Sequence, residues 1–273
     1  LQGAIGNKTM PVKDQYGDIN VTLVEGYVAQ CEIQRGPNNF FDQQLISDLA
    51  DCFTDIDKST DVRAIVLSSE GKHFCAGNNF SAPTHALAQA EDTGTSNPLY
   101  VEAVRLFDCE TPVIAAVQGA AIGGGLGLAV MADFRVLCPD SRLSANFVKI
   151  GITPGFGLTH TLPRIIGLQK ANLMFLSGRR ISGAQAFEWG LGDIFTDTED
   201  VRTAATTLAR EIAENAPLAV VSLREQMRPG LAAEVKATTD IEGAAQHKLK
   251  QTNDHKEGVT AVAERRPGNF TAS

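Results

Sequence analysis

The sequence lacks the cysteine patterns that hold together small secreted domains or structural zinc sites. Its five cysteines are odd in number and widely spaced, and no two of them form a Cys-x-x-Cys pair. Disulfide frameworks and zinc sites need matched cysteines, so neither is predicted, nor is any other metal site. Free thiols favour a reducing compartment, and the cytoplasm is the expected location.

Basic charge and long apolar runs are also scarce. Lysine and arginine number 24 against 32 acidic residues, which gives a formal net charge of −8. Nucleic acid binding needs a clustered basic face, so we exclude that class of partner. The longest apolar stretch is interrupted by Gln118, Asp133 and Arg135, and no segment resembles a signal peptide. We therefore predict neither a membrane span nor a membrane partner.

What remains is an ordinary globular composition, with 43% hydrophobic and 21% charged residues in a chain of 273. Buried-strand runs alternate with segments of helical periodicity as far as about residue 195, which predicts an α/β fold. We expect strands at 19–24, 27–34, 63–68, 113–118 and 134–137, and helices at 41–56, 100–109, 124–131 and 182–189. Asn39 is the expected cap of the first helix.

The pattern changes near residue 198. Strand signals end there, and three helical stretches are expected at 201–215, 217–227 and 231–252. We therefore divide the chain into a core over residues 1–198 and a helical C-terminal region over residues 199–273. Residues 81–98 are small and polar and predict a mobile loop.

Two glycine-containing segments each follow a predicted strand. The first runs Lys72-His73-Phe74-Cys75-Ala76-Gly77-Asn78-Asn79-Phe80, and the second runs from Ala115 to Gly127 with three consecutive glycines. Such turns expose backbone N–H groups, and a helix start adds unpaired donors and a positive dipole end. Two such turns can converge on one developing oxyanion. Tight packing alone is the alternative at each site.

Nucleotide binding is a second alternative role for the three consecutive glycines. No register of this segment satisfies the G-x-G-x-x-G spacing of dinucleotide-binding turns, although Asp140 does follow the next strand. The chain also has no G-K-[ST] sequence, which excludes a P-loop. A dinucleotide-dependent oxidoreductase therefore rests on glycine richness alone.

At these segments the sequence resembles the enoyl-CoA hydratase/isomerase (crotonase) superfamily. Phe74-Cys75-Ala76-Gly77-Asn78-Asn79 is similar to the family's first oxyanion motif, F-x-A-G-x-D, and the segment from Pro112 to Gly125 is similar to its second. The likeness continues through Ala132-Asp133-Phe134-Arg135, Gly151-Ile152-Thr153-Pro154-Gly155, residues 162–167, Ser177-Gly178-Arg179-Arg180-Ile181 and residues 254–270.

The resemblance implies a ClpP-like spiral of ββα units followed by a helical trimerisation region, hence a homotrimer or a dimer of trimers. It implies an acyl-CoA ligand, with coenzyme A as part of the substrate and no prosthetic group. The N–H groups of Ala76 and Gly124 would form the oxyanion hole. The other positions implied to contact substrate are Arg35, Asn39, Lys72, Gly77, Gly123, Phe147 and Phe156.

The sequence departs from the family where relatives keep proton-handling carboxylates. The three positions hold Gly127, Phe147 and Gly155, none of which can exchange a proton. His160 is the speculative replacement, although a packed histidine is the more common reading of such a residue. Weaker candidates are His85, Tyr100, Glu102, Asp108 and the thiol of Cys75.

Three functional hypotheses therefore stand. The first is an acyl-CoA-processing enzyme, acting as a hydratase or an isomerase through a thioester enolate. The second is an acyl-CoA-binding protein without catalysis. A hydrolase of a CoA ester or a carbon–carbon bond that uses a different acid or base belongs to the first hypothesis. The third is the dinucleotide-dependent oxidoreductase that glycine richness alone suggests.

Overall fold

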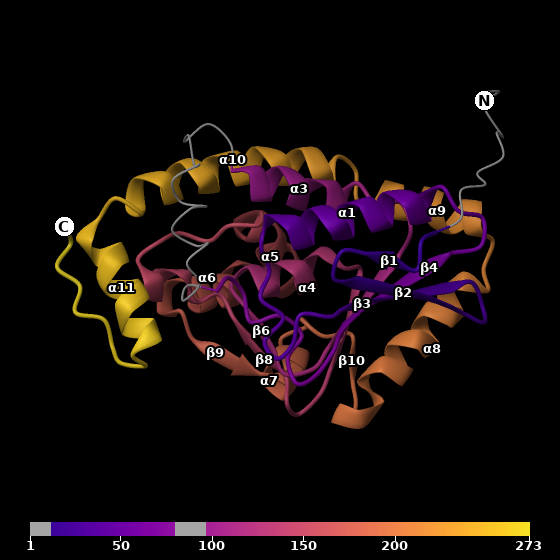
Figure 1. Ribbon diagram of the computed structural model, residues 1–273, viewed down its shortest axis with the longest axis horizontal. Helices are drawn as coiled ribbons and strands as arrows, with labels where there is room; N and C mark the ends of the chain where they lie inside the picture. Colours follow the sequence, from indigo (N-terminus) through magenta and orange to yellow (C-terminus); the bar gives the residue numbers. More distant parts are fainter. Residues whose placement is uncertain (1–11, 80–96) are drawn as a thin grey trace.

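The computed structural model describes residues 12–79 and 97–273, and within them it has a mixed α/β architecture (Figure 1). A seven-stranded sheet has the order β1-β2-β3-β4-β5-β7-β10. Its strands are β1 (Gln15–Tyr16), β2 (Ile19–Val24), β3 (Val28–Ile33), β4 (Ala64–Ser69), β5 (Val113–Val117), β7 (Phe134–Leu137) and β10 (Ile194–Phe195).

The seven-stranded sheet is parallel from β3 to β10, and only β1 and β2 run antiparallel to their neighbours. Parallel sheets carry helices on both faces, which requires strands that are apolar throughout. Every residue of β4 and β5 is buried. This explains why the sequence shows unbroken apolar runs there rather than alternation.

Two helices cover opposite faces of this sheet. On β4, Ala64 and Val66 pack with the buried side of α8 (Val201–Ala213), whereas Ile65 and Leu67 belong to the larger core that includes α1 (Gln43–Asp57). Figure 1 shows α8 on one side of the strands and α1 on the other, with α3 (Pro98–Phe107) beside α1. Although α8 lies beyond residue 198, it therefore forms part of the core layer.

A smaller sheet of three strands carries the second glycine segment. It has the order β6-β8-β9, formed by β6 (Ala120–Ile122), β8 (Arg142–Ser144) and β9 (Arg180–Ser182). The surrounding helices are α4 (Gly124–Met131), α5 (Leu158–Ile166), α6 (Leu168–Ser177) and α7 (Gly183–Glu188), with a 3-10 helix at Asn146–Ile150. Strand, strand and helix thus recur along the chain, and the predicted fold class is confirmed.

The C-terminal region differs in detail from the sequence prediction. After α9 (Pro217–Met227), the helix expected at 231–252 is α10 (Leu231–Leu249), and a further helix that the sequence prediction did not include, α11 (Asn253–Ala263), follows it. Thr252 separates them and caps α11, because its hydroxyl accepts a hydrogen bond from the His255 N–H at 3.1 Å. The division of the chain at residue 198 stays a prediction.

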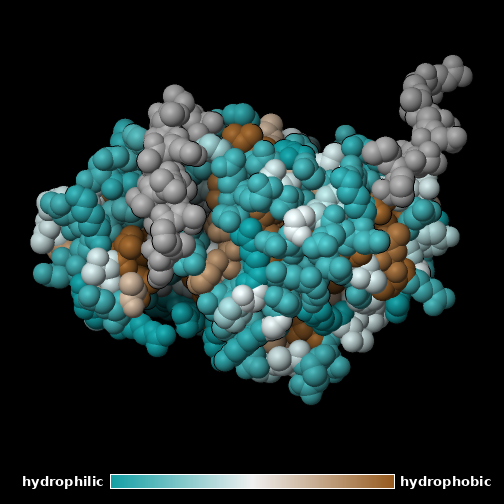
Figure 2. Space-filling view, in the orientation of Figure 1, coloured by the Kyte–Doolittle hydropathy of each residue, from teal (hydrophilic) through white to brown (hydrophobic). Residues whose placement is uncertain are grey.

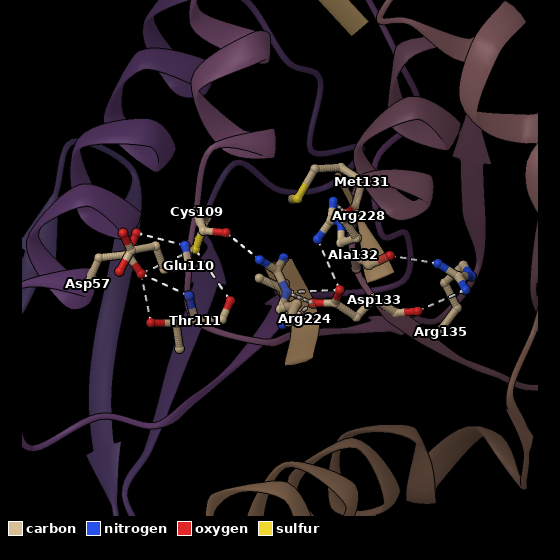
Figure 3. Close-up of polar contacts among 11 residues, drawn as sticks. Asp57, Cys109, Glu110, Thr111, Met131, Ala132, Asp133, Arg135, Arg224 and Arg228 are labelled. Atoms are coloured by element: carbon tan, nitrogen blue, oxygen red, sulfur yellow. Dashed lines mark hydrogen bonds and ion pairs between the residues drawn. The ribbon is translucent and has the colours of Figure 1, made fainter. Parts of the chain in front are cut away.

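Helix α9 is attached to the body mainly by charge. It has no buried residue, but Arg224 donates to both carboxylate oxygens of Asp133, at 3.0 and 2.9 Å, and Arg228 donates to one at 2.9 Å. Figure 3 shows Asp133 between these two guanidinium groups. Asp133 also accepts the Val113 N–H at 2.9 Å, so it links α9 to the start of β5.

The first helix is capped by Asp42 and not by Asn39. The Asp42 carboxylate accepts the Leu45 N–H at 2.9 Å, which satisfies one of the free donors of the first turn. The expectation for Asn39 is therefore wrong. The predicted mobile loop, including His85, lies almost entirely outside the described residues.

Candidate active site

Two glycine segments, distant in sequence, are paired side by side. Cys75 and Ala121 form an isolated parallel bridge, in which the Cys75 N–H donates to Ala120 at 2.9 Å and the Ile122 N–H donates to Cys75 at 3.0 Å. In a parallel register, residues equally far beyond the bridge lie beside each other. Asn78 and Gly124 each lie three residues beyond the bridge, so the parallel register brings them beside each other.

Both segments then turn at a glycine. Gly77 has a φ of +88° and Gly123 has a φ of +58°, conformations that side chains other than glycine rarely adopt. A Cβ at Gly77 would also lie only 2.7 Å from the Ile122 carbonyl oxygen. The N–H groups that follow, on Asn78 and Gly124, have no hydrogen-bond acceptor among the described residues. Each of the two glycine turns is thus followed by one N–H donor without a described acceptor.

The Ala76 N–H is already engaged. It donates to the carbonyl oxygen of Asn38 at 3.0 Å, which holds the first glycine segment against the turn that precedes α1. A donor used in this way is not available to a ligand oxygen. The expectation that Ala76 supplies the first oxyanion donor is therefore corrected, because the N–H group without a described acceptor is that of Asn78.

The two turns open into one cavity of about 560 Å³. Ala76, Gly77 and Asn78 line it from the first segment, and Gly123 and Gly124 line it from the second. Apolar walls come from several elements, namely Phe41, Leu99, Phe147, Ile150, Ile152 and Phe156. A concave apolar site with a few convergent polar groups is typical of small-molecule binding.

The cavity wall leaves no room for a carboxylate at position 127. A Cβ on Gly127 would lie 2.7 Å from Phe156, and one on Gly124 would lie 2.1 Å from the ring of Phe41. The two rings pack edge to face with centroids 6.3 Å apart. The glycines and the aromatic rings are thus complementary in shape, and the space of a longer side chain is filled by phenylalanine.

Position 155 is filled from outside in a similar way. A Cβ on Gly155 would lie 1.8 Å from the hydroxyl oxygen of Tyr100 and 2.8 Å from the amide nitrogen of Gln246. The Tyr100 hydroxyl donates to Gln246 at 2.9 Å. A polar pair from α3 and α10 therefore stands where a side chain of residue 155 would lie.

The ionisable groups that line the cavity are histidine, tyrosine, lysine and arginine. No aspartate or glutamate is among the described lining residues, which include His73, Tyr100, Arg180, Lys250, His255 and Arg265. Burial lowers the pKa of His73, and the positive charges of Lys72 and Arg180 lower it further. The rim near His73 is therefore electropositive, which suits phosphate groups.

His255 was missed by the sequence reasoning, which found no metal-ligand spacing around it. Its ring is buried, and Nδ1 lies 2.7 Å from the carbonyl oxygen of Ile150. A carbonyl oxygen accepts only, so Nδ1 carries a proton and donates it to Ile150. In the described part of the chain Nε2 has no partner.

Four predicted residues do not line the cavity. Arg35 pairs with Asp18 at 2.5 Å and Asp42 at 2.8 Å, and Asn39 is fully buried. The Asn39 amide donates to two carbonyl oxygens of the loop at residues 70–73, at 2.9 and 2.6 Å. Both residues hold the turn in place, whereas the turn residues that reach the cavity are Asn38, Phe40 and Phe41.

Lys72 and His160 are the other two. Lys72 is exposed next to the cavity rim, and His160 lies on α5 away from the lining. Neither Glu102, which pairs with Arg105 at 2.6 Å, nor Asp108 lines the cavity. Closeness to a motif in the sequence did not predict which of these side chains line the cavity. For residues on helices, the position around the helix decides where each side chain points.

The Cys75 thiol lies inside the first segment but is not activated. It is fully buried, and burial raises its pKa to about 12. A nucleophilic cysteine needs a depressed pKa, so at neutral pH this group is an inert thiol.

The described residues are 12–79 and 97–273. Within these ranges no cluster of three or more His, Cys, Asp or Glu side chains is arranged to hold a metal ion. None of the helices described there combines the length and the apolarity needed to cross a bilayer.

Comparison with known proteins gives consistent matches over nearly the whole chain. A family model described as enoyl-CoA hydratase/isomerase matches residues 24–273. A probable enoyl-CoA hydratase of Bacillus subtilis (strain 168) is 30% identical over 248 residues, covering 90% of this chain and 96% of that protein. The 1,2-epoxyphenylacetyl-CoA isomerase of Escherichia coli (strain K12) is 29% identical over 239 residues, covering 85% and 90%.

A solved structure also matches the fold of this chain. The crystal structure of an enoyl-CoA hydratase/isomerase from Pseudoalteromonas atlantica T6c superimposes with a TM-score of 0.82 at 26% identity. The superposition covers 93% of this chain and 100% of the Pseudoalteromonas chain.

Proposed function

Because the chain belongs to the enoyl-CoA hydratase/isomerase family, we propose that it binds an acyl-CoA thioester and polarises the thioester carbonyl with the backbone N–H groups of Asn78 and Gly124. The observation that carries this proposal is the pair of unpaired donors that follow Gly77 and Gly123 on two hydrogen-bonded segments. Gly124 keeps the role expected from the sequence, and Asn78 replaces Ala76.

The chemistry follows from where the negative charge develops. When a proton leaves the carbon next to a thioester, or when a nucleophile attacks the thioester, charge accumulates on the carbonyl oxygen. Two fixed N–H donors stabilise that oxyanion, and the helix dipole of α4 adds to the effect at Gly124. In known enzymes, loss of one such donor costs about 10²–10³ in rate.

The proton carrier is the open part of this function. The described cavity residues offer no carboxylate, so hydratase or isomerase chemistry would need another group. His255 is the proposed proton carrier, since it lines the cavity and its Nε2 has no hydrogen-bond partner among the described residues. The relatives include both a hydratase and an epoxide isomerase, so the family does not select the reaction.

A second candidate is an acyl-CoA-binding protein that has lost catalysis. The specific observation in its favour is that Phe156 and the Tyr100 hydroxyl fill the space beside Gly127 and Gly155. A hydrolase of a CoA ester or of a carbon–carbon bond also remains a proposal, since its tetrahedral anion would use the same two donors.

The coenzyme A portion would use the basic residues of the cavity. Phosphate groups pair with cationic side chains, and Arg180, Lys250 and Arg265 all contribute to the lining. Lys72, exposed beside His73, remains a proposed contact. The cofactor requirement proposed here is therefore coenzyme A within the substrate, and no separate prosthetic group.

We also propose a homotrimer or a dimer of trimers in the cytoplasm. The exposed apolar side chains of α9, Leu218, Leu223 and Met227, give a second copy of the chain a surface to cover. All five thiols are free, which suits a reducing compartment.

The proposed function is tested by comparing butyryl-CoA with the S-butyl thioether of CoA, which lacks the carbonyl oxygen. We expect the thioester to bind at least about tenfold more tightly, and its carbonyl infrared band to move to lower frequency on binding. Asn78→Pro removes the N–H and should reduce both effects, whereas Asn78→Ala keeps the N–H and should not. Equal affinity for the two ligands in the parent protein would contradict the proposal.

Proton exchange between the bound acyl-CoA and deuterium oxide distinguishes catalysis from binding alone. An enzyme of this class should introduce deuterium next to the thioester carbonyl, or hydrate or cleave a member of a panel of acyl-CoA esters. Tight binding without any of these reactions would favour the non-catalytic protein.

A further inference from the structure

A buried carboxylate on α10 has no role in the proposed function. Glu242 is 3% exposed, and it lies where α10 passes the start of α5. Its two oxygens accept hydrogen bonds from the Gly157 N–H at 2.8 Å, the Thr159 N–H at 2.9 Å and the Thr159 hydroxyl at 2.7 Å. Gly157 has no side chain that could cap α5, so a carboxylate from a distant helix satisfies the free donors there.

The hydrogen bonds of Glu242 hold a turn with an unusual backbone. The Leu158 N–H donates to the Gly155 carbonyl at 3.2 Å, which closes a tight turn around Phe156 and Gly157. Both central residues have positive φ, +63° at Phe156 and +70° at Gly157. Glycine adopts this conformation freely, whereas in phenylalanine it persists only where the surroundings enforce it. Glu242 supplies such a constraint, because it holds the N–H of the residue that directly follows Phe156.

Two further residues of α10 hold the same turn. The Gln246 amide nitrogen donates to the Thr153 carbonyl at 2.9 Å, which fixes the chain just before the turn. Val235 has a methyl carbon 2.7 Å from where a Cβ on Gly157 would lie, so the helix packs closely against the turn itself. These two residues and Glu242 are all buried residues of α10, which therefore contacts the turn and its approach from three positions.

The aromatic ring held by this turn forms part of the cavity wall. Phe156 lines the cavity, packs edge to face on Phe41 with centroids 6.3 Å apart, and lies 6.5 Å from the Phe107 ring. The Phe41 ring in turn lies against Gly124, where a Cβ would be 2.1 Å from it. An acyl chain held by its carbonyl oxygen at Gly124 would therefore meet this aromatic wall, and the position of the Phe156 ring limits the space beyond it.

We propose that Glu242 is a positioning residue, which holds Phe156 in its positive-φ conformation and thereby limits the length of acyl chain that the cavity accepts. This inference rests on the proposed function, because it needs an acyl-CoA in the cavity. Glu242 is not among the described lining residues, so it acts through the turn and not by contact with the ligand. Without the carboxylate, Phe156 can relax to the negative φ that phenylalanine prefers, and its ring leaves the wall.

The test compares the binding of butyryl-CoA and octanoyl-CoA by titration calorimetry. In Glu242→Gln one oxygen is replaced by an amide group that cannot accept, so the turn loses at least one hydrogen bond. We expect the ratio of octanoyl-CoA to butyryl-CoA affinity to rise about tenfold over the parent protein, the gain from burying about two more methylene groups. Thr159→Val removes only the hydroxyl donor, and it should raise the ratio about two- to threefold.

A double-mutant cycle shows whether the effect passes through Phe156. Phe156→Gly removes the ring and adopts positive φ without strain, so this variant should show the raised ratio by itself. Adding Glu242→Gln to it should then change the ratio by less than about twofold, because no ring is left to position. A rise of equal size in both backgrounds would overturn the inference.

Asp57 provides a matched control for the loss of a carboxylate that holds a distant turn. It accepts the same kinds of donor, the N–H groups of Glu110 and Thr111, both at 2.9 Å, and the Thr111 hydroxyl at 2.7 Å (Figure 3). None of these three residues lines the cavity. Asp57→Asn should lower the unfolding temperature, as Glu242→Gln should, but it should leave the affinity ratio within about twofold of the parent value.

The outcomes separate the inference from the proposed function. If neither CoA ester binds the parent protein, the proposed function is wrong, and the inference is wrong with it. If both esters bind and folded Glu242→Gln keeps the parent ratio, or if Asp57→Asn raises the ratio as much, only the inference is overturned. Should Glu242→Gln not fold, an unchanged ratio in Thr159→Val overturns the inference in the same way.

Discussion

Two backbone N–H groups in the first glycine segment, those of Ala76 and Asn78, lie two residues apart and differ in what they meet. The Ala76 donor points at the Asn38 carbonyl, whereas the Asn78 donor follows a positive-φ glycine and has no described acceptor. Side-chain identity plays no part in this difference. The direction of the backbone decides it. A sequence motif lists residue types, and only its glycine reflects that direction.

The second glycine gives the clearest residue-scale prediction. A Cβ at Gly124 would lie 2.1 Å from the Phe41 ring, so Gly124→Ala should move the ring or the turn and misplace the N–H donor. We expect the advantage of thioester over thioether in binding to fall by about tenfold or more. Gly124→Ala combined with Phe41→Leu, which removes the clash, should recover part of it. No change in the single variant would count against this donor.

Cys75 gives a prediction in pH. Burial raises its pKa from the ordinary value of 9.0 to about 12, so folding favours the protonated thiol. Its contribution to stability is present below pH 9 and lost as pH rises toward 12. In the folded protein, alkylation of Cys75 should stay slow from pH 7 to pH 10, whereas in urea it should accelerate as the thiol ionises. Peptide mapping by mass spectrometry measures both rates, and fast native labelling would show that the thiol is accessible.

His160 should be dispensable for chemistry. It lies on α5 outside the cavity lining, so His160→Ala should leave acyl-CoA binding within about twofold of the parent protein. His255→Gln, at a histidine that does line the cavity, is the comparison and should change binding or turnover more. A larger loss at His160 than at His255 would reverse this assignment.

At the scale of elements, one carboxylate pairs with both arginines at the C-terminal end of α9. The side chains of Arg224 and Arg228 are only 12% and 17% exposed, and both pair with Asp133. Removing one partner of a buried pair leaves uncompensated charge, which costs about 3–5 kcal/mol. Helices packed by apolar contact, such as α8 on the sheet, have no comparable single point of attachment.

Asp133→Asn should therefore loosen α9 before the rest of the chain. We expect faster trypsin cleavage after Arg224 and a lower unfolding temperature. Asp140→Asn, at an exposed carboxylate that accepts a hydrogen bond from the Thr198 hydroxyl at 3.2 Å, is the matched control and should behave as the parent protein. An unchanged cleavage rate in Asp133→Asn would mean that other contacts hold the helix.

At the scale of the whole molecule, exposed apolar side chains predict assembly. Leu218 is 85% exposed, Met227 71% and Ile241 73%, and α9 buries none of its residues within one chain. Figure 2 shows a mostly hydrophilic face on which apolar residues gather in separate patches. Because α9 leaves its apolar side chains exposed within one chain, a second copy is the partner that would cover them.

The assembly is tested by Leu218→Glu combined with Met227→Glu. We expect the parent protein to sediment as a trimer or hexamer and the double variant to dissociate toward monomers. Leu23→Glu, at a half-exposed leucine on β2, is the control and should keep the parent mass. A monomeric parent protein would contradict the predicted trimer.

The sequence by itself determined the fold class, the family and the two glycine segments. Apolar runs such as 64–67 can be satisfied only by a sheet covered on both faces, and glycines at positive φ have few substitutes, so these features are legible locally. The tertiary structure decided which N–H groups stay unpaired, that Arg35 and Asn39 brace a turn, and that Tyr100, Gln246 and His255 reach the cavity. Those facts depend on backbone direction and helix phase across segments more than a hundred residues apart, which no local pattern encodes.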